Sequence, residues 1–259
     1  MKFDELDGKM RVFETAHDHC VLPEVFIVVR LDGRGFTKLT KEIHEFEAPF
    51  DLRFRALMVR TVEHLMTCGF QSVYGYTQSD EISLLLARDE TAFGRKERKL
   101  SSVLAGEASA AFSLALGAHA CFDARVCQLP TRELVRDYFR WRSEDAHRNA
   151  LNAHCYWLQR RQGASATQAT ARLEGMSVAD KNELLFQGGL NFNDLPSWQK
   201  RGVGVFWATY FKEATNPKTG EEVKAPRRKL QVQLELPLRE EYETFVLGLL
   251  DGERRFLNE

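Results

Sequence analysis

The stretch that decides the fold is SVYGYTQSDEISLLLA, residues 72–87. Both halves are rich in aromatic, β-branched and aliphatic residues, and the polar TQSD between them is typical of a tight turn. We therefore predict two short antiparallel strands. Two acidic residues, Asp80 at the tip of the hairpin and Glu81 after it, precede the second apolar run. Charge in that position needs a partner, which suggests a chemical role for these two residues.

A second apolar run has the same character. VFIVVRLDGRGF, residues 25–36, reads as a buried strand that ends in an acid, Asp32, followed by two glycines. Apolar residues at helical spacing predict helices over 50–70 and 99–116, and ACFDARVCQLP (120–130) predicts another strand. The order strand, helix, hairpin, helix, strand is that of an α/β (α+β) sandwich, with helices on one face of a mostly antiparallel sheet.

The character of the chain changes after residue 130. Residues 131–163 predict one long helix or two, and two short helices follow around Gly175. A strand pair joined by the turn-rich ATNPKTGEE (214–222) and a closing amphipathic helix complete the chain. We predict a catalytic domain over 1–130 and a C-terminal helical and β-hairpin extension over 131–259. Because no flexible linker separates them, we expect one compact unit.

Composition limits the class of protein. The chain has 259 residues, a formal net charge of −1 and an odd number of cysteines, five in all. Scattered, odd cysteines suit a reducing compartment, and no apolar run has the length of a membrane span or signal peptide, so we expect a cytoplasmic protein with no membrane contact. GRKERK (94–99), WLQRR (157–161) and KAPRRK (224–229) are locally basic. These runs are either phosphate-binding stripes or solvated faces.

The acids at the ends of the predicted strands indicate a metal site. In a sandwich of this order the first strand can lie next to the hairpin, which places Asp32 and Asp80 side by side. Two adjacent carboxylates repel unless they share a divalent cation, and Mg²⁺ prefers oxygen ligands. Gly33 lets the backbone approach closely, so its carbonyl is a further candidate ligand. The alternative is that the acids cap a sheet edge in solvent.

Glu81 needs a separate argument, because adjacent residues in a strand point to opposite faces. If the strand has already begun at Asp80, only one of the pair faces the metal. We prefer Asp80 and treat Glu81 as a supporting residue or an alternative ligand. Two Mg²⁺ ions about 4 Å apart can activate an attacking hydroxyl and stabilise a leaving pyrophosphate. Asp32, Asp80 and Glu81 are therefore the candidate catalytic residues.

RLDGRGFTKLT (30–40) followed by YTQSDE (76–81) resembles the tRNA(His) guanylyltransferase superfamily. The likeness continues, in order, through HEFEAPFD (44–51), RKERKLSSVLAGEASAAF (95–112), FDARV (122–126), YFRWRSEDAHRNALN (138–152) and SVADKNELLF (177–186). Enzymes of this family use a polymerase-like palm to add nucleotides to the 5′ end of RNA, opposite in direction to ordinary polymerases. The resemblance implies a palm-like sheet and 3′–5′ nucleotidyltransferase activity here.

The resemblance also implies roles for individual residues. Asp32 and Asp80 match the family's metal-binding carboxylates, with the Gly33 carbonyl assisting, and Glu81 matches an acid important for activity. The implied contacts with a nucleotide or its triphosphate are Arg30, Gly33, Arg34, Gly35, Phe36, Ser79, Lys96 and Lys99. The implied contacts with tRNA or a second nucleotide are Arg95, Arg98, His147, Asn149 and Lys181. The implied cofactor is a pair of Mg²⁺ ions, the implied substrates are GTP, ATP and the acceptor stem and 5′ end of a tRNA, and the implied assembly is a homotetramer.

Two segments depart from the eukaryotic pattern. HINNLYN corresponds here to HRNALNA at 147–153, so that Ala150 and Ala153 replace asparagines, and KPND corresponds to APFD at 48–51. These changes resemble the bacterial and archaeal branch, which favours template-directed repair of 5′-truncated tRNAs. We expect such repair, after activation of the 5′ end by ATP or GTP. The first alternative is addition of a single 5′ guanosine to tRNA(His); a palm-type nucleotidyl cyclase and an inactive tRNA-binding protein are the others.

Overall fold

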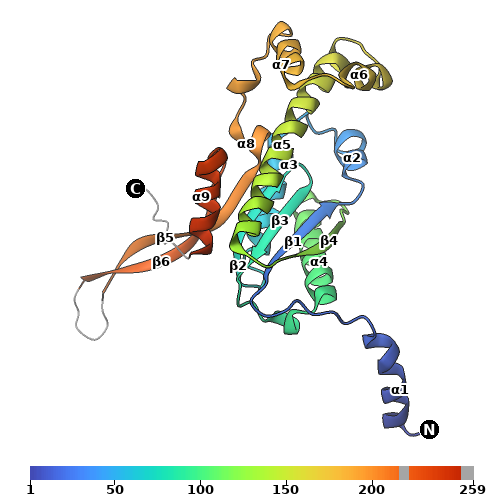
Figure 1. Ribbon diagram of the computed structural model, residues 1–259, viewed down its shortest axis with the longest axis vertical. Helices are drawn as coiled ribbons and strands as arrows, with labels where there is room; N and C mark the ends of the chain where they lie inside the picture. The colour runs from blue at the N-terminus through green and yellow to red at the C-terminus, as the bar shows by residue number, and fades with distance from the viewer. Residues whose placement is uncertain (216–221, 252–259) are drawn as a thin grey trace.

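The structure, a computed structural model, describes residues 1–215 and 222–251 (Figure 1). Its strands and α-helices, in chain order, are α1 (Phe3–Thr15), β1 (Phe26–Gly33), α2 (Phe36–Lys38), α3 (Leu52–Leu65), β2 (Ser72–Gln78), β3 (Glu81–Leu86), α4 (Glu97–Leu116), β4 (Phe122–Leu129), α5 (Arg132–Arg161), α6 (Ala166–Leu173), α7 (Val178–Gln187), α8 (Ser197–Arg201), β5 (Val203–Thr215), β6 (Glu222–Gln233) and α9 (Arg239–Leu250). The stretch 131–163 thus contains one long helix, α5. Most of the turn predicted at 214–222 lies outside the described residues.

The strands form one antiparallel sheet in the order β4-β1-β3-β2-β5-β6. β2 and β3 are the predicted hairpin, and β1 pairs with β3 in a register that sets Asp32 opposite Glu81. The last two strands come from the C-terminal half, because β5 pairs with β2. The extension therefore completes the sheet of the first half and does not merely pack beside it.

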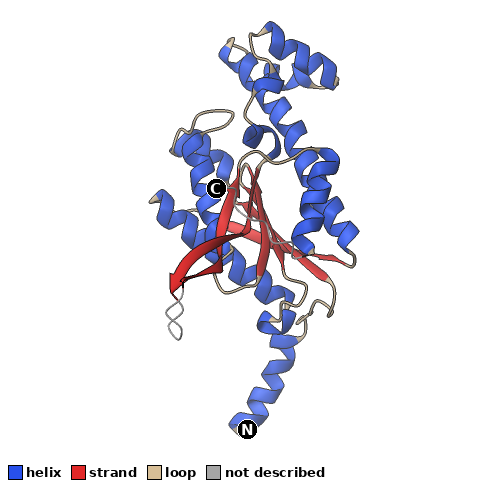
Figure 2. Ribbon diagram, turned by 90° about the vertical axis from the view of Figure 1, so that its left-hand side faces the viewer, coloured by secondary structure: helices blue, strands red, loops and turns tan. Residues whose placement is uncertain are grey.

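Helices cover both faces of this sheet (Figure 2). On one face α3 and α4 pack against Ile27, Val29 and Leu31 of β1, and on the other α5 and α9 pack near Phe26 and Val28. The prediction of helices on one face is confirmed for residues 1–130; the helices of the second face come from the C-terminal half. The uninterrupted apolar run of β1 has its physical reason here, because a strand buried on both faces needs apolar residues at successive positions.

Two parts of the molecule extend beyond the sheet. The distal half of α5 carries α6 and α7, which share a small apolar cluster with it, and α1 projects from the opposite end (Figure 1). The sequence reasoning did not predict α1, none of whose residues is buried. None of the helices in the described residues is long and apolar enough to cross a membrane.

Candidate functional site

The end of β1 meets the turn of the β2–β3 hairpin. The backbone N–H of Gly33 donates to the carbonyl oxygen of Asp80 at 3.0 Å. Asp32 lies directly opposite Glu81 in the β1–β3 ladder, and residues so paired share one face of a sheet. The structure thus brings Asp32, Gly33, Asp80 and Glu81 together at one end of the sheet, where the sequence analysis expected them.

Asp80 lies in the turn and not in the strand. β3 begins at Glu81, and the preceding Ser79 has a left-handed φ of 53° that turns the chain. The alternation argument used to separate Asp80 from Glu81 therefore does not apply, because it requires both residues to be in extended backbone. The Ser79 hydroxyl donates to a carboxylate oxygen of Asp80 at 3.1 Å. The turn thus orients Asp80 independently of the strand.

The electrostatics of Asp80 suit a cation. Burial raises the pKa of its carboxyl above the ordinary value, and the negative charges of Asp32 and Glu81 raise the pKa further. No group of three or more His, Cys, Asp or Glu side chains in the described part of the chain is arranged to hold a metal ion. Two carboxylates and the Gly33 carbonyl fit Mg²⁺ nonetheless, since this ion usually keeps several ligands from water and substrate phosphate.

Glu81 is held by two arginines. Arg30 of β1 pairs with one carboxylate oxygen, and Arg142 of α5 donates to the other at 3.0 Å. Arg142 also donates to Asp145 at 2.7 Å, and its side chain is only 6% exposed. With both oxygens engaged, Glu81 is placed to support the site and not to ligate a metal in this arrangement.

Arg142 was missed by the sequence reasoning. Its signal was present, because Arg142 continues the three-and-four spacing of buried α5 residues that includes Phe139 and Ala146. A charged residue at a core-facing helix position needs a buried partner. No sequence rule pointed to Glu81 as that partner, because sixty-one residues separate the two in the chain.

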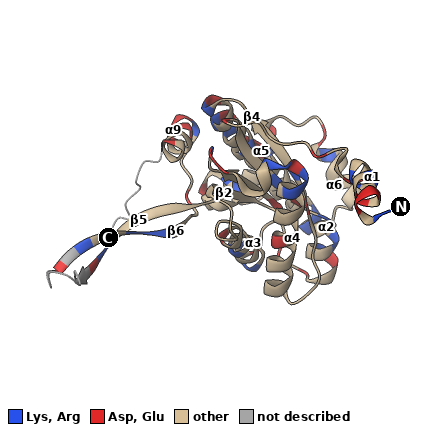
Figure 3. Ribbon diagram, turned by 90° about the horizontal axis from the view of Figure 1, so that it is seen from below, with Lys and Arg blue, Asp and Glu red and all other residues tan. Residues whose placement is uncertain are grey.

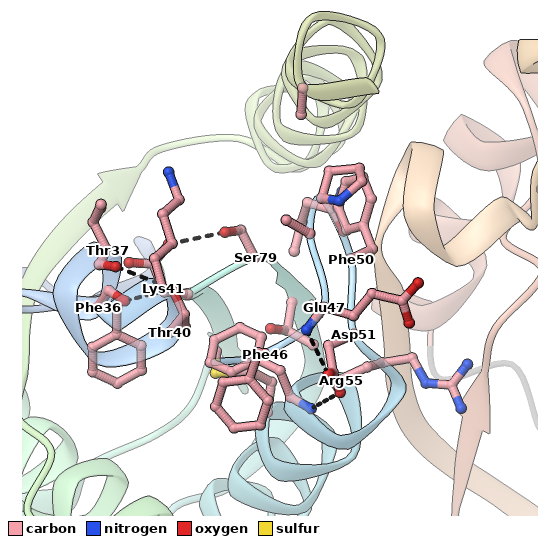
Figure 4. Close-up of a pocket in the computed structure, with 18 of the residues that line it drawn as sticks. Phe36, Thr37, Thr40, Lys41, Phe46, Glu47, Phe50, Asp51, Arg55 and Ser79 are labelled. Carbon is pink, nitrogen blue, oxygen red and sulfur yellow. Dashed lines mark hydrogen bonds between the residues drawn. The ribbon is translucent and has the colours of Figure 1, made fainter. Parts of the chain in front are cut away.

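A cavity of about 260 Å³ opens beside Asp80 (Figure 4). Its aromatic lining is formed by Phe36, Phe46, Phe50, Phe54, Trp157 and Trp198, and its charged lining includes Lys41, Glu47, Asp51 and Arg55. Figure 4 shows Phe36 and Lys41 on one side, and Phe50 and Arg55 on the other. Aromatic faces stack on nucleobases, and cations attract phosphates. The cavity therefore has the chemistry to take a nucleotide.

Three of the four replaced lysine and asparagine positions lie in the wall of this cavity, and the fourth, Ala150, does not. Ala48, Phe50 and Ala153 all line it. The Phe50 ring packs edge-on to Trp198, with the ring centroids 5.9 Å apart. The substitutions therefore make the cavity wall more apolar at the point where the eukaryotic segments carry lysine and asparagine.

Asp51, also in the cavity wall, caps the first turn of α3. Its carboxylate accepts hydrogen bonds from the backbone N–H groups of Glu47, Arg53 and Phe54. Burial alone would raise the pKa of this carboxyl, but hydrogen bonds from the Arg53 side chain and from these backbone groups hold the pKa well below its usual range. Asp51 therefore stays ionised and fixes the loop that bears Phe46 and Phe50.

Of the remaining residues of the first half that were predicted to contact a nucleotide, some line the cavity and others do not. Phe36 and Ser79 line the cavity. Gly35, with a φ of 73°, begins α2, a conformation that favours glycine. Arg34 is exposed, and its backbone N–H donates to the carbonyl oxygen of Cys121 at 2.8 Å.

The cations of residues 95–99 lie at the other end of β1. The Arg95 guanidinium is buried and donates to carbonyl oxygens of Val25 and Glu90, among others. Lys96 and Arg98 both pair with Asp18. β1 has eight residues, so this end is about 25 Å from the acids at ~3.3 Å per residue. Arg95 is therefore a structural residue within its own chain, and its expected contact with tRNA stays a prediction.

Lys99 and the predicted contacts of the second half are spread over three helices. Lys99 lies over the Phe93 ring, on α4. His147 packs against Phe192, and burial lowers the pKa of its imidazole, with the nearby positive charges of α8 adding to the effect. Asn149 donates to Asp145 at 3.2 Å and so joins the carboxylate network around Glu81. Lys181 is half-buried on α7.

The basic runs occupy separate surfaces. GRKERK leads into α4 near α1, WLQRR ends α5, and KAPRRK lies on β6, which projects from the body together with β5 (Figure 3). On this ribbon Arg228 lies over the Trp207 ring, at 5.1 Å from its centroid. The charge of the chain is thus distributed over several faces.

Known proteins resemble this chain over most of its length. The family model described as tRNAHis guanylyltransferase matches residues 7–130, and the model of the Thg1 C-terminal domain matches residues 133–242. A relative in Drosophila melanogaster, named "Probable tRNA(His) guanylyltransferase", is 36% identical over 196 residues, which cover 72% of this chain and 68% of that protein. The tRNA(His) guanylyltransferase of Debaryomyces hansenii is 31% identical over 245 residues, 89% of this chain and 90% of the relative.

Solved structures give the same result. A bacterial tRNA(His) guanylyltransferase (Thg1)-like protein in complex with ATP matches with a TM-score of 0.73 at 26% identity, and covers 95% of this chain and 99% of that one. A second structure with the same description, in complex with GTP, matches with a TM-score of 0.72.

Proposed function

Because the chain belongs to the tRNA(His) guanylyltransferase family, whose members are nucleotidyltransferases acting on tRNA, we propose that it adds guanosine to the 5′ end of tRNA(His). The observation that carries this proposal is the meeting of Asp32, Gly33 and Asp80 beside an aromatic cavity. The names of the curated relatives favour single guanosine addition over the repair reaction expected from the sequence. The ATP and GTP complexes of the structural relatives support the same two nucleotides as substrates here.

In the proposed mechanism Asp32, Asp80 and the Gly33 carbonyl would hold Mg²⁺, which supplies charge neutralisation at the triphosphate when bound. The aromatic cavity stacks the base, and Lys41 and Arg55 at its edge attract phosphate oxygens. Two phosphoryl transfers are needed. A 5′-monophosphate first attacks a nucleoside triphosphate and releases pyrophosphate; the 3′-hydroxyl of the incoming nucleotide then attacks the activated 5′ phosphate and releases the nucleoside monophosphate.

The same proposal gives a role to the predicted contact residues that lie away from the cavity. His147, Asn149 and Lys181 lie on helices of the C-terminal half and are proposed to contact tRNA. Lys96, Arg98 and Lys99 are too far from Asp80 to reach a nucleotide bound there in one chain. Their proposed contact with a phosphate therefore involves another part of the tRNA, or the site of another copy in the homotetramer that the family resemblance implies. The absence of disulfides among the five cysteines supports a reducing, cytoplasmic location.

Template-directed repair is the second candidate. The observation that favours it is the position of Ala48, Phe50 and Ala153 in the cavity wall, where the eukaryotic segments carry polar residues. A wall with fewer hydrogen-bonding groups reads the edge of a base less strictly. Selection of the nucleotide by pairing with a template strand would then take over from selection by the protein.

One experiment separates these reactions. The protein is incubated with Mg²⁺, ATP and all four nucleoside triphosphates, and with either tRNA(His) lacking its extra 5′ guanosine or a tRNA lacking its first 5′ nucleotide. The length of the products is read on a sequencing gel. Addition of one guanosine to tRNA(His) alone supports the proposal, and restoration of the truncated tRNA alone supports repair. No extension of either RNA would contradict both reactions.

The carboxylates are tested in the same assay. Asp32→Asn and Asp80→Asn should abolish extension, because each removes a charge that the metal needs. Asp137→Asn is the matched control, since Asp137 is an aspartate on α5 that does not line the cavity and is 52% exposed. Equal activity in all three variants would contradict the metal assignment.

A further inference from the structure

The amino-terminal helix α1 presents an apolar stripe that no residue in the described part of the chain buries. Phe3, Leu6, Met10 and Phe13 are 78%, 45%, 53% and 72% exposed, and no residue of α1 is buried. Figures 1 and 2 show α1 projecting away from the body of the molecule. Exposed large apolar residues that lie together on one helix face are typical of an interaction surface.

The spacing of the stripe is that of a coiled-coil seam. Phe3, Leu6, Met10 and Phe13 follow each other at three, four and three residues, the pattern of successive a and d positions in two heptads. At ~100° per residue the four side chains fall within about 80° of the helix circumference. Val12, the other exposed apolar residue of α1, lies on the far side of the helix and outside the stripe.

The charges beside the stripe differ between its two flanks. In the same heptad Lys9 occupies a g position, whereas Asp7 and Glu14 occupy e positions. Asp7 already pairs with Arg11 on the outer surface of α1, at 2.6 Å. Lys9 and Glu14 are therefore the clearest pair of opposite charges on opposite flanks.

We propose that α1 pairs in parallel with α1 of a second copy of this chain, through the stripe formed by Phe3, Leu6, Met10 and Phe13. In a parallel pair a g residue of one helix faces an e residue of its partner, so Lys9 meets Glu14 of the other copy twice, once on each side. In an antiparallel pair each flank would face the same flank of the partner, and like charges would meet. The charges on the two flanks therefore favour a second copy of α1 as the partner, and a parallel orientation of the two helices.

The seam is short. Two heptads are near the lower limit of length for a helix that is stable in water by itself, and four apolar residues a side bury less area than a stable dimer interface needs. We therefore expect the α1 pair to strengthen a contact that the globular bodies also make. This inference is independent of the proposed reaction, because self-association requires neither nucleotide nor tRNA.

Cysteine cross-linking of the full-length protein tests the seam directly. In a parallel pair Met10 faces its own counterpart, so Met10→Cys should form a disulfide-linked dimer under mild oxidation. Val12→Cys is the matched control, because it places the new thiol on the same helix but away from the stripe. Both variants keep the five native cysteines, including the exposed Cys20. Dimer above the parent level for Met10→Cys alone supports the proposal; equal yields, or none, would overturn it.

Charge exchange tests the direction. Sedimentation velocity should show that Lys9→Glu and Glu14→Lys each weaken self-association, and that the double variant restores it. Met10→Glu should raise the dissociation constant on the order of tenfold or more, because each dimer loses two buried methionines, whereas Val12→Glu should not. A parent protein that stays monomeric, or a double variant no better than either single one, would overturn the proposal. The latter result would place α1 on the body of another copy instead.

Discussion

Replacing Arg142 by methionine should destabilise the protein far more than the same change at a surface arginine of the same helix. The Arg142 side chain is 6% exposed and bonds Glu81 at 3.0 Å and Asp145 at 2.7 Å. Removing one partner of a buried ion pair costs about 3–5 kcal/mol. Because Glu81 and Asp145 are 29% and 28% exposed, solvent screens them in part, and we expect a loss of about 2–3 kcal/mol.

Arg140→Met is the matched control. Arg140 also lies on α5 and also bonds two carboxylates, those of Glu144 at 2.7 Å and Glu243 at 2.8 Å, but its side chain is 51% exposed. Exposed pairs contribute about 0–1 kcal/mol. Urea unfolding followed by circular dichroism should therefore separate the two variants by at least about 1 kcal/mol. In thermal unfolding the loss in Arg142→Met should lower Tm by roughly 5–10 °C.

A free energy of unfolding for Arg142→Met within about 0.5 kcal/mol of that for Arg140→Met would refute the reasoning, since the Arg142 side chain is 6% exposed and that of Arg140 is 51% exposed. A double-mutant cycle with Glu81→Gln measures the specific contact. We expect a coupling energy of about 1–2 kcal/mol between Arg142 and Glu81. No coupling would mean that Arg142 acts through Asp145 alone.

Three further predictions follow from the site. Gly33→Ala should cost about 1–3 kcal/mol of stability in urea unfolding, because its new Cβ would lie 2.6 Å from the ring of Phe36; Gly106→Ala, in a helix with open space, should be neutral or stabilising. Asp51→Ala should cost about 1–2 kcal/mol at pH 7. Because the pKa of Asp51 is lowered in the folded state, this difference should be present above about pH 4 and shrink as the pH falls further; a constant difference down to pH 2.5 would contradict the assignment. Mg²⁺ at ten times its Kd should stabilise the parent protein by about 1.4 kcal/mol in thermal unfolding and leave Asp80→Asn unchanged.

The sheet and its acidic end could be predicted because their signals are local. The composition of residues 72–87 predicts the hairpin, and that of residues 25–36 predicts the strand. Asp32 lies at the end of that strand and Asp80 in the turn of the hairpin, so both acids could be found from the same local signals. The α7 capping box, in which Ser177 and Asp180 bond each other's backbone N–H groups, is equally local. Such features depend on residues within one turn or one strand.

The features that sequence reasoning missed depend on distant partners. Arg142 contributes to the site because α5 lies across the face of β3 and brings Arg142 to Glu81. No pattern of neighbouring residues in the sequence predicts that contact. Arg95 looks like a surface cation in the run GRKERK, yet a left-handed φ of 59° and the carbonyl groups around it make it a buried structural residue. The role of Glu81 stayed open between supporting residue and alternative ligand, because the residue at which the strand begins decides the face that a side chain occupies.

The pairing of β2 with β5 has a consequence for the way the chain is made. More than a hundred residues separate the end of β2 from the start of β5, so at ~5–20 residues per second a ribosome needs roughly 6–25 s to supply the missing neighbour. During that interval the edge of β2 from Tyr74 to Thr77 has no strand to bond. An unpaired edge readily accepts a strand from another molecule. Several ribosomes on one messenger RNA hold such incomplete sheets close together. Copies of this chain are therefore most exposed to strand mispairing while many ribosomes translate the same messenger RNA.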